Sequence, residues 1–223
     1  CHRTEHHRVK GRLMPPTEDP ATRVACTDCR AARPHGDERV DAHTATVACQ
    51  TCHIPEFAVE TATKLWWDWS KAGRDGDPET VAEAVREEVL AGGDAARGVP
   101  PVVLDALRRV GTDPDVRVHY DKKKGLFLLA RRQVPTYRWY DGTTARHVPG
   151  QRYDGPGPLP MNVPQGRPHD PRARIHPFKV HRGIQPFDAR EHHLLVPHTF
   201  GPGGYWTAFD WELHHLLAVS SGN

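Results

Sequence analysis

The sequence has little apolar material for a chain of its length. Of its 223 residues, 37% are hydrophobic, against 21 Pro and 19 Gly, and the mean hydropathy is -0.66. Side chains of this composition cannot fill a large core, and the chain would be partly disordered unless a bound group supplied apolar volume. No apolar run approaches the length of a membrane span, so no transmembrane segment is expected in this stretch.

A strong charge of one sign is also missing. The formal net charge is +2, from 30 basic and 28 acidic residues. Basic clusters such as Lys122–Lys124 and Arg131–Arg132 are local and form no continuous stripe. Because nucleic-acid binders normally concentrate basic residues on one face, nucleic acid is not an expected partner.

Cysteine is scarce, whereas histidine is abundant. There are five Cys, an odd number, and four of them form two C-x-x-C pairs. This pattern argues against a disulfide framework and favours attachment of a metal or a haem. The 16 His agree with that interpretation, because imidazole is the commonest nitrogen ligand of metals in proteins.

One C-x-x-C pair, Cys49 and Cys52, is followed directly by His53. In this pattern the two thiols can add to the vinyl groups of one haem, and the adjacent imidazole can bind its iron. The alternative is a four-thiolate zinc site, because Cys26, Cys29, Cys49 and Cys52 are spaced C-x2-C-x19-C-x2-C. The position of His53, a second Cys-His pair and the excess of His favour covalent haem c.

Two further motifs are incomplete. Cys26 and Cys29 are followed by Arg30 where the axial His should stand, and a protonated guanidinium has no lone pair for iron. Either a haem there takes another ligand, or it has been lost and the thiols are relics. Cys1-His2 is either the lipidated start of a mature lipoprotein or, as we favour, the end of a C-x-x-C-H whose first residues are cut away. An exported protein is compatible with both.

A haem with two imidazole ligands needs a second His from elsewhere in the chain. The candidate iron ligands besides His53 are His2, His6, His7, His35, His43 and His181. For each of these residues, an ordinary polar surface position is the alternative.

An aromatic run follows the intact motif. Trp66, Trp67 and Trp69 are expected to pack against a face or an edge of a haem. Lys64 and Asp68 beside them are candidates for a catalytic pair in a small-anion pocket, with Lys supplying positive charge and Asp a proton. A solvated Lys is the alternative.

Regular periodicity is confined to a few segments. Asp77 and Pro78 are start signals for a helix in which Val81, Val85 and Val89 share one face. The predicted elements after it are a helix over 101–110, a β-hairpin over 116–129, an extended Pro- and Gly-rich segment over 134–206 and a helix over 207–219.

The predicted fold is therefore mainly α with extensive irregular loops and a small β-hairpin. It is a multihaem cytochrome c in which haems serve as much of the core. We expect a haem-attachment segment over 1–73, a helical insertion over 74–115, and a part over 116–223 that carries the hairpin, the wrapping segment and the last helix.

Several separated blocks of sequence support a resemblance. They are VACQTCHIPEFA, TKLWWDWSKAG, YDKKKGLF, VPTYRWYDGT, ARIHPFKVHRGIQPFD and LLVPHTFGPGGYWTAFDW, in that order. With these blocks the chain resembles the tetrathionate reductase family of octahaem c-type cytochromes, except around 74–115. The resemblance implies a periplasmic protein with eight closely packed covalent haems, most with two His ligands. It also implies one haem with a Lys ligand, which reduces tetrathionate, nitrite or hydroxylamine.

The resemblance also implies roles for individual residues. Cys49, Cys52 and His53 would hold one of the later haems, and Cys26 and Cys29 match another attachment motif. Since one motif is intact, one altered and one cut, we expect a portion of a longer protein that lacks the Lys-ligated haem. Lys64 is therefore not assigned as its ligand.

The expected function is electron transfer within a reductase of small inorganic anions. Redox proteins or quinol-linked donors are the expected partners. A multihaem electron carrier without a substrate of its own is the first alternative, and a zinc-binding four-Cys domain is the second.

Overall fold

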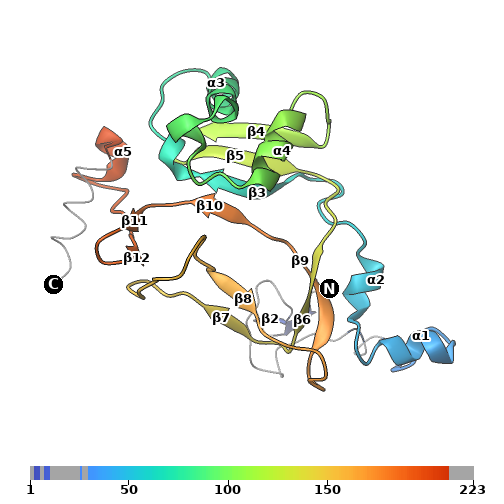
Figure 1. The fold of residues 1–223 in the computed structure, drawn as a ribbon. Helices are drawn as coiled ribbons and strands as arrows, with labels where there is room; N and C mark the ends of the chain where they lie inside the picture. The colour runs from blue at the N-terminus through green and yellow to red at the C-terminus, as the bar shows by residue number, and fades with distance from the viewer. Residues whose placement is uncertain (1–2, 6–7, 11–25, 27–29, 211–223) are drawn as a thin grey trace. The chain divides into compact units, whose positions relative to one another are not determined.

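The computed structural model describes residues 3–5, 8–10, 26 and 30–210 (Figure 1). The chain forms two compact units that alternate along the sequence. Unit 1 consists of Cys1–Pro55, Val134–His147 and Pro158–Lys179. Unit 2 consists of Glu56–Gln133, Val148–Gly157 and Val180–Asn223.

Unit 2 is built on a four-stranded sheet in the order β10-β3-β5-β4. Strands β4 (Val116–Asp121) and β5 (Gly125–Ala130) form an antiparallel hairpin, as the sequence predicts. Strand β3 (Thr63–Asp68) pairs antiparallel with β5, and β10 (Arg182–Ile184) pairs parallel with β3. The sheet therefore joins segments that lie far apart in the sequence.

Two helices of unit 2 pack on this sheet (Figure 1). Helix α3 (Pro78–Ala91) begins where Asp77 accepts a hydrogen bond from the Thr80 amide at 2.9 Å, and it ends at Gly92. Helix α4 (Pro101–Arg109) follows. Both helices confirm the sequence prediction, because their caps and apolar spacing are local signals.

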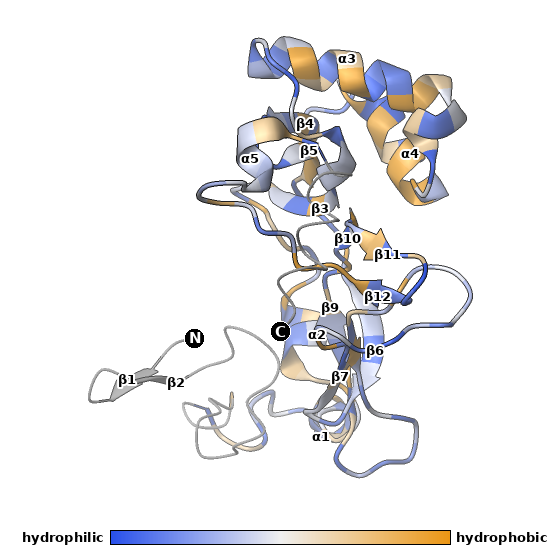
Figure 2. Cartoon of the chain, turned by 90° about the vertical axis from the view of Figure 1, so that its left-hand side faces the viewer, coloured by the Kyte–Doolittle hydropathy of each residue, from blue (hydrophilic) through white to orange (hydrophobic). Residues whose placement is uncertain are grey.

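The buried face of the helices meets alternate residues of the strands. Val85, Leu107, Leu126 and Trp66 are each 0% exposed in this core. Apolar and polar residues interchange along both helices (Figure 2). Burial of a side chain such as Leu107 contributes about 1.5–3 kcal/mol to the stability of the unit.

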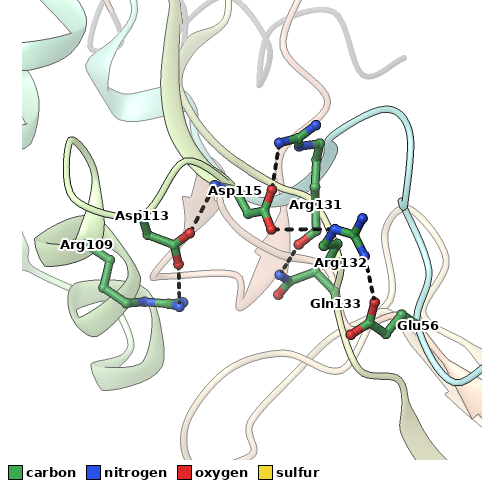
Figure 3. A network of polar contacts seen from close by, with 7 residues as sticks. All are labelled: Glu56, Arg109, Asp113, Asp115, Arg131, Arg132 and Gln133. Carbon is green, nitrogen blue, oxygen red and sulfur yellow. Dashed lines mark hydrogen bonds and ion pairs between the residues drawn. The ribbon is translucent and has the colours of Figure 1, made fainter.

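A polar network joins the two ends of the first segment of unit 2, which begins at Glu56 and ends at Gln133 (Figure 3). Arg131 and Arg132 lie 2.8 and 3.9 Å from the Asp115 carboxylate, and Arg132 lies 3.6 Å from Glu56. Backbone hydrogen bonds between Phe57 and Gln133 close the same point, at 2.9 and 3.0 Å. The start of unit 2 at Glu56 and Phe57 is thus held to residues 131–133.

The rest of unit 2 contains short elements. They are η3 (Trp69–Lys71), η4 (Gly93–Ala96), β11 (Phe187–Asp188), β12 (His193–Leu194) and α5 (Tyr205–Ala208). Helix α5 ends at Phe209, whose φ of 54° is left-handed. The helix predicted over 207–219 lies for the most part outside the described residues.

Unit 1 contains short elements. Its helices are α1 (Glu38–His43) and α2 (Cys49–His53). Its two-stranded sheets pair β1 (Arg3–Glu5) with β2 (Arg8–Lys10), β6 (Thr136–Tyr140) with β9 (Arg174–Phe178), and β7 (Thr144–Arg146) with β8 (Asn162–Pro164).

Unit 1 has few buried apolar side chains among its described residues. They are Ala48, Tyr140 and Ala173. Its large apolar residues that are exposed are Val40, Ile54, Val134, Tyr137 and Met161. The contrast with the core of unit 2 indicates that unit 1 needs apolar volume from something other than its side chains.

The prediction of a mainly α fold is wrong. Short helices and short strands are mixed along the described chain. The error arose because the Pro- and Gly-rich segment was expected to stay irregular, whereas it forms β9 and β10, which pair with distant strands. Backbone hydrogen bonding of this kind leaves little trace in side-chain periodicity. Within the described residues, no helix has the length and hydropathy that a bilayer crossing requires.

Candidate haem-attachment site

The intact C-x-x-C-H forms helix α2, Cys49–His53. In a helix, residues three apart lie on the same side, so the Cys49 and Cys52 thiols belong to one face. Cys49 is half-buried, whereas Cys52 and His53 are exposed, and neither thiol is in a disulfide. The motif thus presents two free thiols and an imidazole at the surface of unit 1.

Helix α2 is anchored to strand β9 through one residue, Ile175. The Ile175 carbonyl accepts from the Ala48 amide at 3.0 Å and from the Thr51 hydroxyl at 2.7 Å. The Ile175 amide donates to the Thr46 carbonyl at 2.8 Å. Since Thr51 lies between the two thiols in the sequence, this anchor fixes the helix from within the motif.

His35 is held by a carboxylate in the neighbouring helix. Asp41 in α1 is 7% exposed, and its Oδ1 accepts from the His35 amide at 3.1 Å and contacts the ring Nδ1 at 2.9 Å. Burial raises the pKa of Asp41, but hydrogen bonds from the backbone and the ring of His35 outweigh it and leave that pKa lower than usual. A carboxylate only accepts, so Nδ1 carries a proton, and in the neutral ring the lone pair is then on Nε2.

The rings of His35 and His53 lie near each other with nearly parallel planes. Their centres are 6.1 Å apart, and their planes are 15° from parallel. A metal binds an imidazole nitrogen at about 2 Å, and the ring centre lies about 1 Å behind that nitrogen, so two imidazoles on opposite sides of one ion have centres about 6 Å apart. The observed separation therefore fits a pair of axial ligands.

The residues of unit 1 fit a covalently held haem by their donor chemistry. Two free thiols one helical turn apart, a neighbouring imidazole and a second imidazole oriented by a carboxylate make up the donor set. The exposed Ile54 directly after His53 adds apolar surface. Thiols and imidazoles are also zinc ligands, but no group of three or more metal-binding side chains converges among the described residues, which do not include Cys29.

Cys26, the described thiol of the second C-x-x-C pair, comes close to Cys49. Burial raises the pKa of the Cys26 thiol, and the charge of Cys49 and a hydrogen bond with Cys49 raise it further. The thiols of two successive motifs therefore interact directly. Arg30 is exposed.

The other predicted ligands are not gathered at this site. His43 is exposed at the end of α1. His181, in unit 2, is exposed, with Nδ1 3.3 Å from the Lys64 carbonyl oxygen. The remaining predicted site residues, Cys1, His2, His6, His7 and Cys29, lie outside the described residues.

Lys64 and Asp68 differ in their exposure to solvent. Lys64 is exposed, and its Nζ lies 4.1 Å from the centre of the Phe127 ring. Asp68 is 0% exposed, and its Oδ1 accepts from the Ser70 amide and hydroxyl at 3.0 and 2.6 Å. Lys64 thus makes a cation–π contact and Asp68 a local cap, and their joint action in catalysis stays a prediction.

Two tryptophans of the run are hydrogen-bonded to the turn between β4 and β5 in unit 2. The indoles of Trp67 and Trp69 donate to the carbonyls of Lys124 and Lys123, at 2.5 and 3.2 Å. Trp66, by contrast, lies in the core beneath the helices. The contacts of these side chains among the described residues are with protein, and haem packing stays a prediction.

Residues that sequence reasoning missed are Asp41, Thr51 and Ile175. The six-residue spacing of His35 and Asp41 matches no sequence motif for a His–carboxylate pair. Ile175 holds α2 through its backbone groups, which its residue type does not reveal. Only the possible helix start at Asp37, which accepts from Arg39 and Val40 amides at 2.9 Å, could have pointed to an ordered segment beside His35.

Comparison with known proteins agrees with this chemistry. A family model described as bacterial cytochrome c matches residues 64–219. The chain is similar to octahaem cytochrome c from Shewanella oneidensis, with 36% identity and a TM-score of 0.70. That alignment covers 100% of this chain and 44% of the octahaem protein, so the chain spans less than half the length of that relative. No curated protein matches the chain. With a family model that matches most of its length and a full-length resemblance to an octahaem protein, the chain belongs to the bacterial cytochrome c family.

Proposed function

We propose that unit 1 holds a haem c on Cys49 and Cys52, with His53 and His35 as its two axial ligands, and that this haem relays electrons. The observation that carries the proposal is the near-parallel pair of imidazoles with centres 6.1 Å apart. One of them belongs to the attachment motif, and the other reaches the same place from a different segment.

Each residue has a distinct task in this arrangement. Cys49 and Cys52 would hold the haem through thioether bonds, and the Ile175 anchor fixes the helix α2 that carries them. His53 and His35, whose ring centres lie 6.1 Å apart, would be the two nitrogen ligands of its iron. When bound, the haem supplies a one-electron couple, and two imidazole ligands leave no open position for a substrate. The site is therefore suited to electron transfer.

The position of Cys26 beside Cys49 supports a relay through a second haem. The interaction of Cys26 with Cys49 brings the thiols of two motifs together. A haem held by Cys26 and Cys29 would lie beside the first one, so electrons would pass between them over a short distance. Arg30 makes that second haem dependent on a ligand from another segment.

The wider assignment rests on the similarity to an octahaem cytochrome. We place the chain in a longer exported, periplasmic reductase that acts on tetrathionate, nitrite or hydroxylamine and takes electrons from a redox protein or a quinol-linked donor. The relative is an octahaem cytochrome c of more than twice this length, and it aligns over the whole of this chain. A carrier without its own substrate is the second candidate, favoured by the different surroundings of the predicted catalytic pair, in which Lys64 is exposed and Asp68 is buried.

The first test is covalent haem content. The chain is matured in a host that attaches haem c, and a pyridine haemochrome spectrum is recorded after denaturation and extraction. We expect covalent haem that is lost in the double variant Cys49→Ser/Cys52→Ser. Stoichiometric zinc without covalent haem would contradict the proposal.

The second test separates a reductase from a carrier. Oxidation of a reduced viologen dye is followed with tetrathionate, nitrite and hydroxylamine in turn. Turnover by the matured chain would show that it contains the reducing site. Rapid electron exchange without turnover of any of the three would favour the carrier function for this chain.

A further inference from the structure

We infer that Asp41 is a positioning residue for the haem of unit 1: it orients His35 toward the iron and lowers the midpoint potential of that haem. The inference rests on the proposed ligation by His35. It goes beyond that ligation because it assigns the control of orientation and potential to a residue that touches neither the haem nor its thiols.

Two contacts to one oxygen fix His35. The same Asp41 Oδ1 meets the His35 amide at 3.1 Å and the His35 ring nitrogen Nδ1 at 2.9 Å. One contact sets the backbone and the other sets the rotation of the ring about its side-chain bonds. With Nδ1 occupied, Nε2 is the nitrogen left to bind iron, and the ring plane lies 15° from that of His53.

Asp41 is itself rigidly placed. It belongs to α1, whose first turn is capped by Asp37. The Asp41 carbonyl also accepts from the Thr44 hydroxyl at 2.7 Å. With 7% of its surface exposed, Asp41 has little freedom to turn away from His35. A buried carboxylate is costly unless it has hydrogen-bond donors, and the amide and the ring of His35 supply them to Asp41.

A carboxylate behind a ligand also changes the metal. The carboxylate accepts a hydrogen bond from Nδ1, which raises the basicity of Nε2 and makes it a stronger electron-pair donor to the metal. Metal-bound His residues often have such a partner. A stronger donor and a nearby negative charge favour ferric over ferrous iron. The axial ligand and its hydrogen bonding are the main levers on haem potential, so Asp41 should lower the potential of this haem.

The test compares two carboxylates in the same helix. Asp41→Asn keeps an oxygen acceptor of the same shape but removes the charge, and Asp37→Asn removes an equal charge from a capping residue that does not touch His35. In the haem-loaded full chain we expect D41N to stay low-spin with a more positive midpoint potential. A tenfold shift of the reduction equilibrium would be about 59 mV for one electron. We expect D37N to move the potential much less.

A third variant tests orientation by a second readout. Asp41→Ala removes both contacts to His35, so we expect part of the haem to become high-spin in the electron paramagnetic resonance spectrum, with recovery on addition of imidazole. An unchanged potential in D41N, an equal shift in D37N, or a D41A spectrum identical to that of the parent chain would each overturn the inference.

Failure of the underlying ligation would look different. If His35→Ala leaves the low-spin spectrum intact, His35 is not the ligand, and the proposed ligation and the role of Asp41 fall together. If His35→Ala abolishes that spectrum while D41N and D41A behave as the parent chain, His35 remains the ligand and only the role of Asp41 is overturned.

Discussion

The imidazoles of His35 and His53 lie with their centres 6.1 Å apart and their planes 15° from parallel, although one precedes α1 and the other ends α2. The two segments meet because α2 is hydrogen-bonded to Ile175 and because Asp41 holds His35. A ring pair with this spacing fits opposite ligands of one ion. It is the link between the attachment motif and the rest of unit 1.

Removal of the second imidazole should change the spin state of the haem. In His35→Ala we expect the haem on Cys49 and Cys52 to lose its sixth ligand and become high-spin, and added imidazole should restore the low-spin spectrum. The matched control is His43→Ala, which removes an exposed imidazole from the end of α1. Visible and electron paramagnetic resonance spectra provide the measurement, and an equal effect in both variants would count against His35.

A new imidazole in the altered motif should produce a second low-spin signal. Arg30→His places a lone pair at the position that follows Cys26 and Cys29, where the guanidinium has none. The expected result is a larger low-spin fraction in the haem-loaded chain. Arg33→His, at another exposed arginine nearby, is the control. If the spectrum of Arg30→His equals that of the parent chain, the lost-ligand interpretation is wrong.

The core of unit 2 should carry stability independently of the haem. Leu107 is 0% exposed, so Leu107→Ala leaves a cavity and should lower the free energy of unfolding by about 2–5 kcal/mol. Val102→Ala in the same helix removes a side chain that is 54% exposed and should cost much less. Urea unfolding followed by far-ultraviolet circular dichroism measures both. A Leu107→Ala variant as stable as Val102→Ala would contradict the packing.

Asp68 should make unit 2 less stable as the pH rises. Burial raises the pKa of Asp68, and the opposing hydrogen bonds of Ser70 and the charge of Lys71 do not cancel that effect. A carboxyl whose pKa is higher in the folded than in the unfolded chain contributes stability below its unfolded pKa of about 3.9, and that contribution is lost as the pH rises through the folded value.

The variant Asp68→Asn isolates this effect. It keeps the Oδ1 acceptor for Ser70 and removes the titration, so its free energy of unfolding should fall less as the pH rises above the unfolded pKa of about 3.9. Asp105→Asn removes an exposed carboxylate of the same unit as a control. Urea unfolding at a series of pH values checks the prediction, and parallel pH profiles for parent and Asp68→Asn would refute it.

The sequence alone determined the local chemistry. Cys49, Cys52 and His53 needed no tertiary information, because thioether attachment depends on a spacing within one helical turn. Helices α3 and α4 and the β4–β5 hairpin followed from caps, apolar periods and a turn. Such signals are local, and they predict local structure well.

The folded chain was needed for everything that joins distant segments. Among several His candidates, only the structure brought His35 to His53, supplied Asp41 behind it and tied α2 to Ile175. It also paired β10 with β3 and buried Asp68 away from Lys64. These contacts depend on backbone hydrogen bonds and packing between remote residues, and neither has a period or a motif that a single sequence displays.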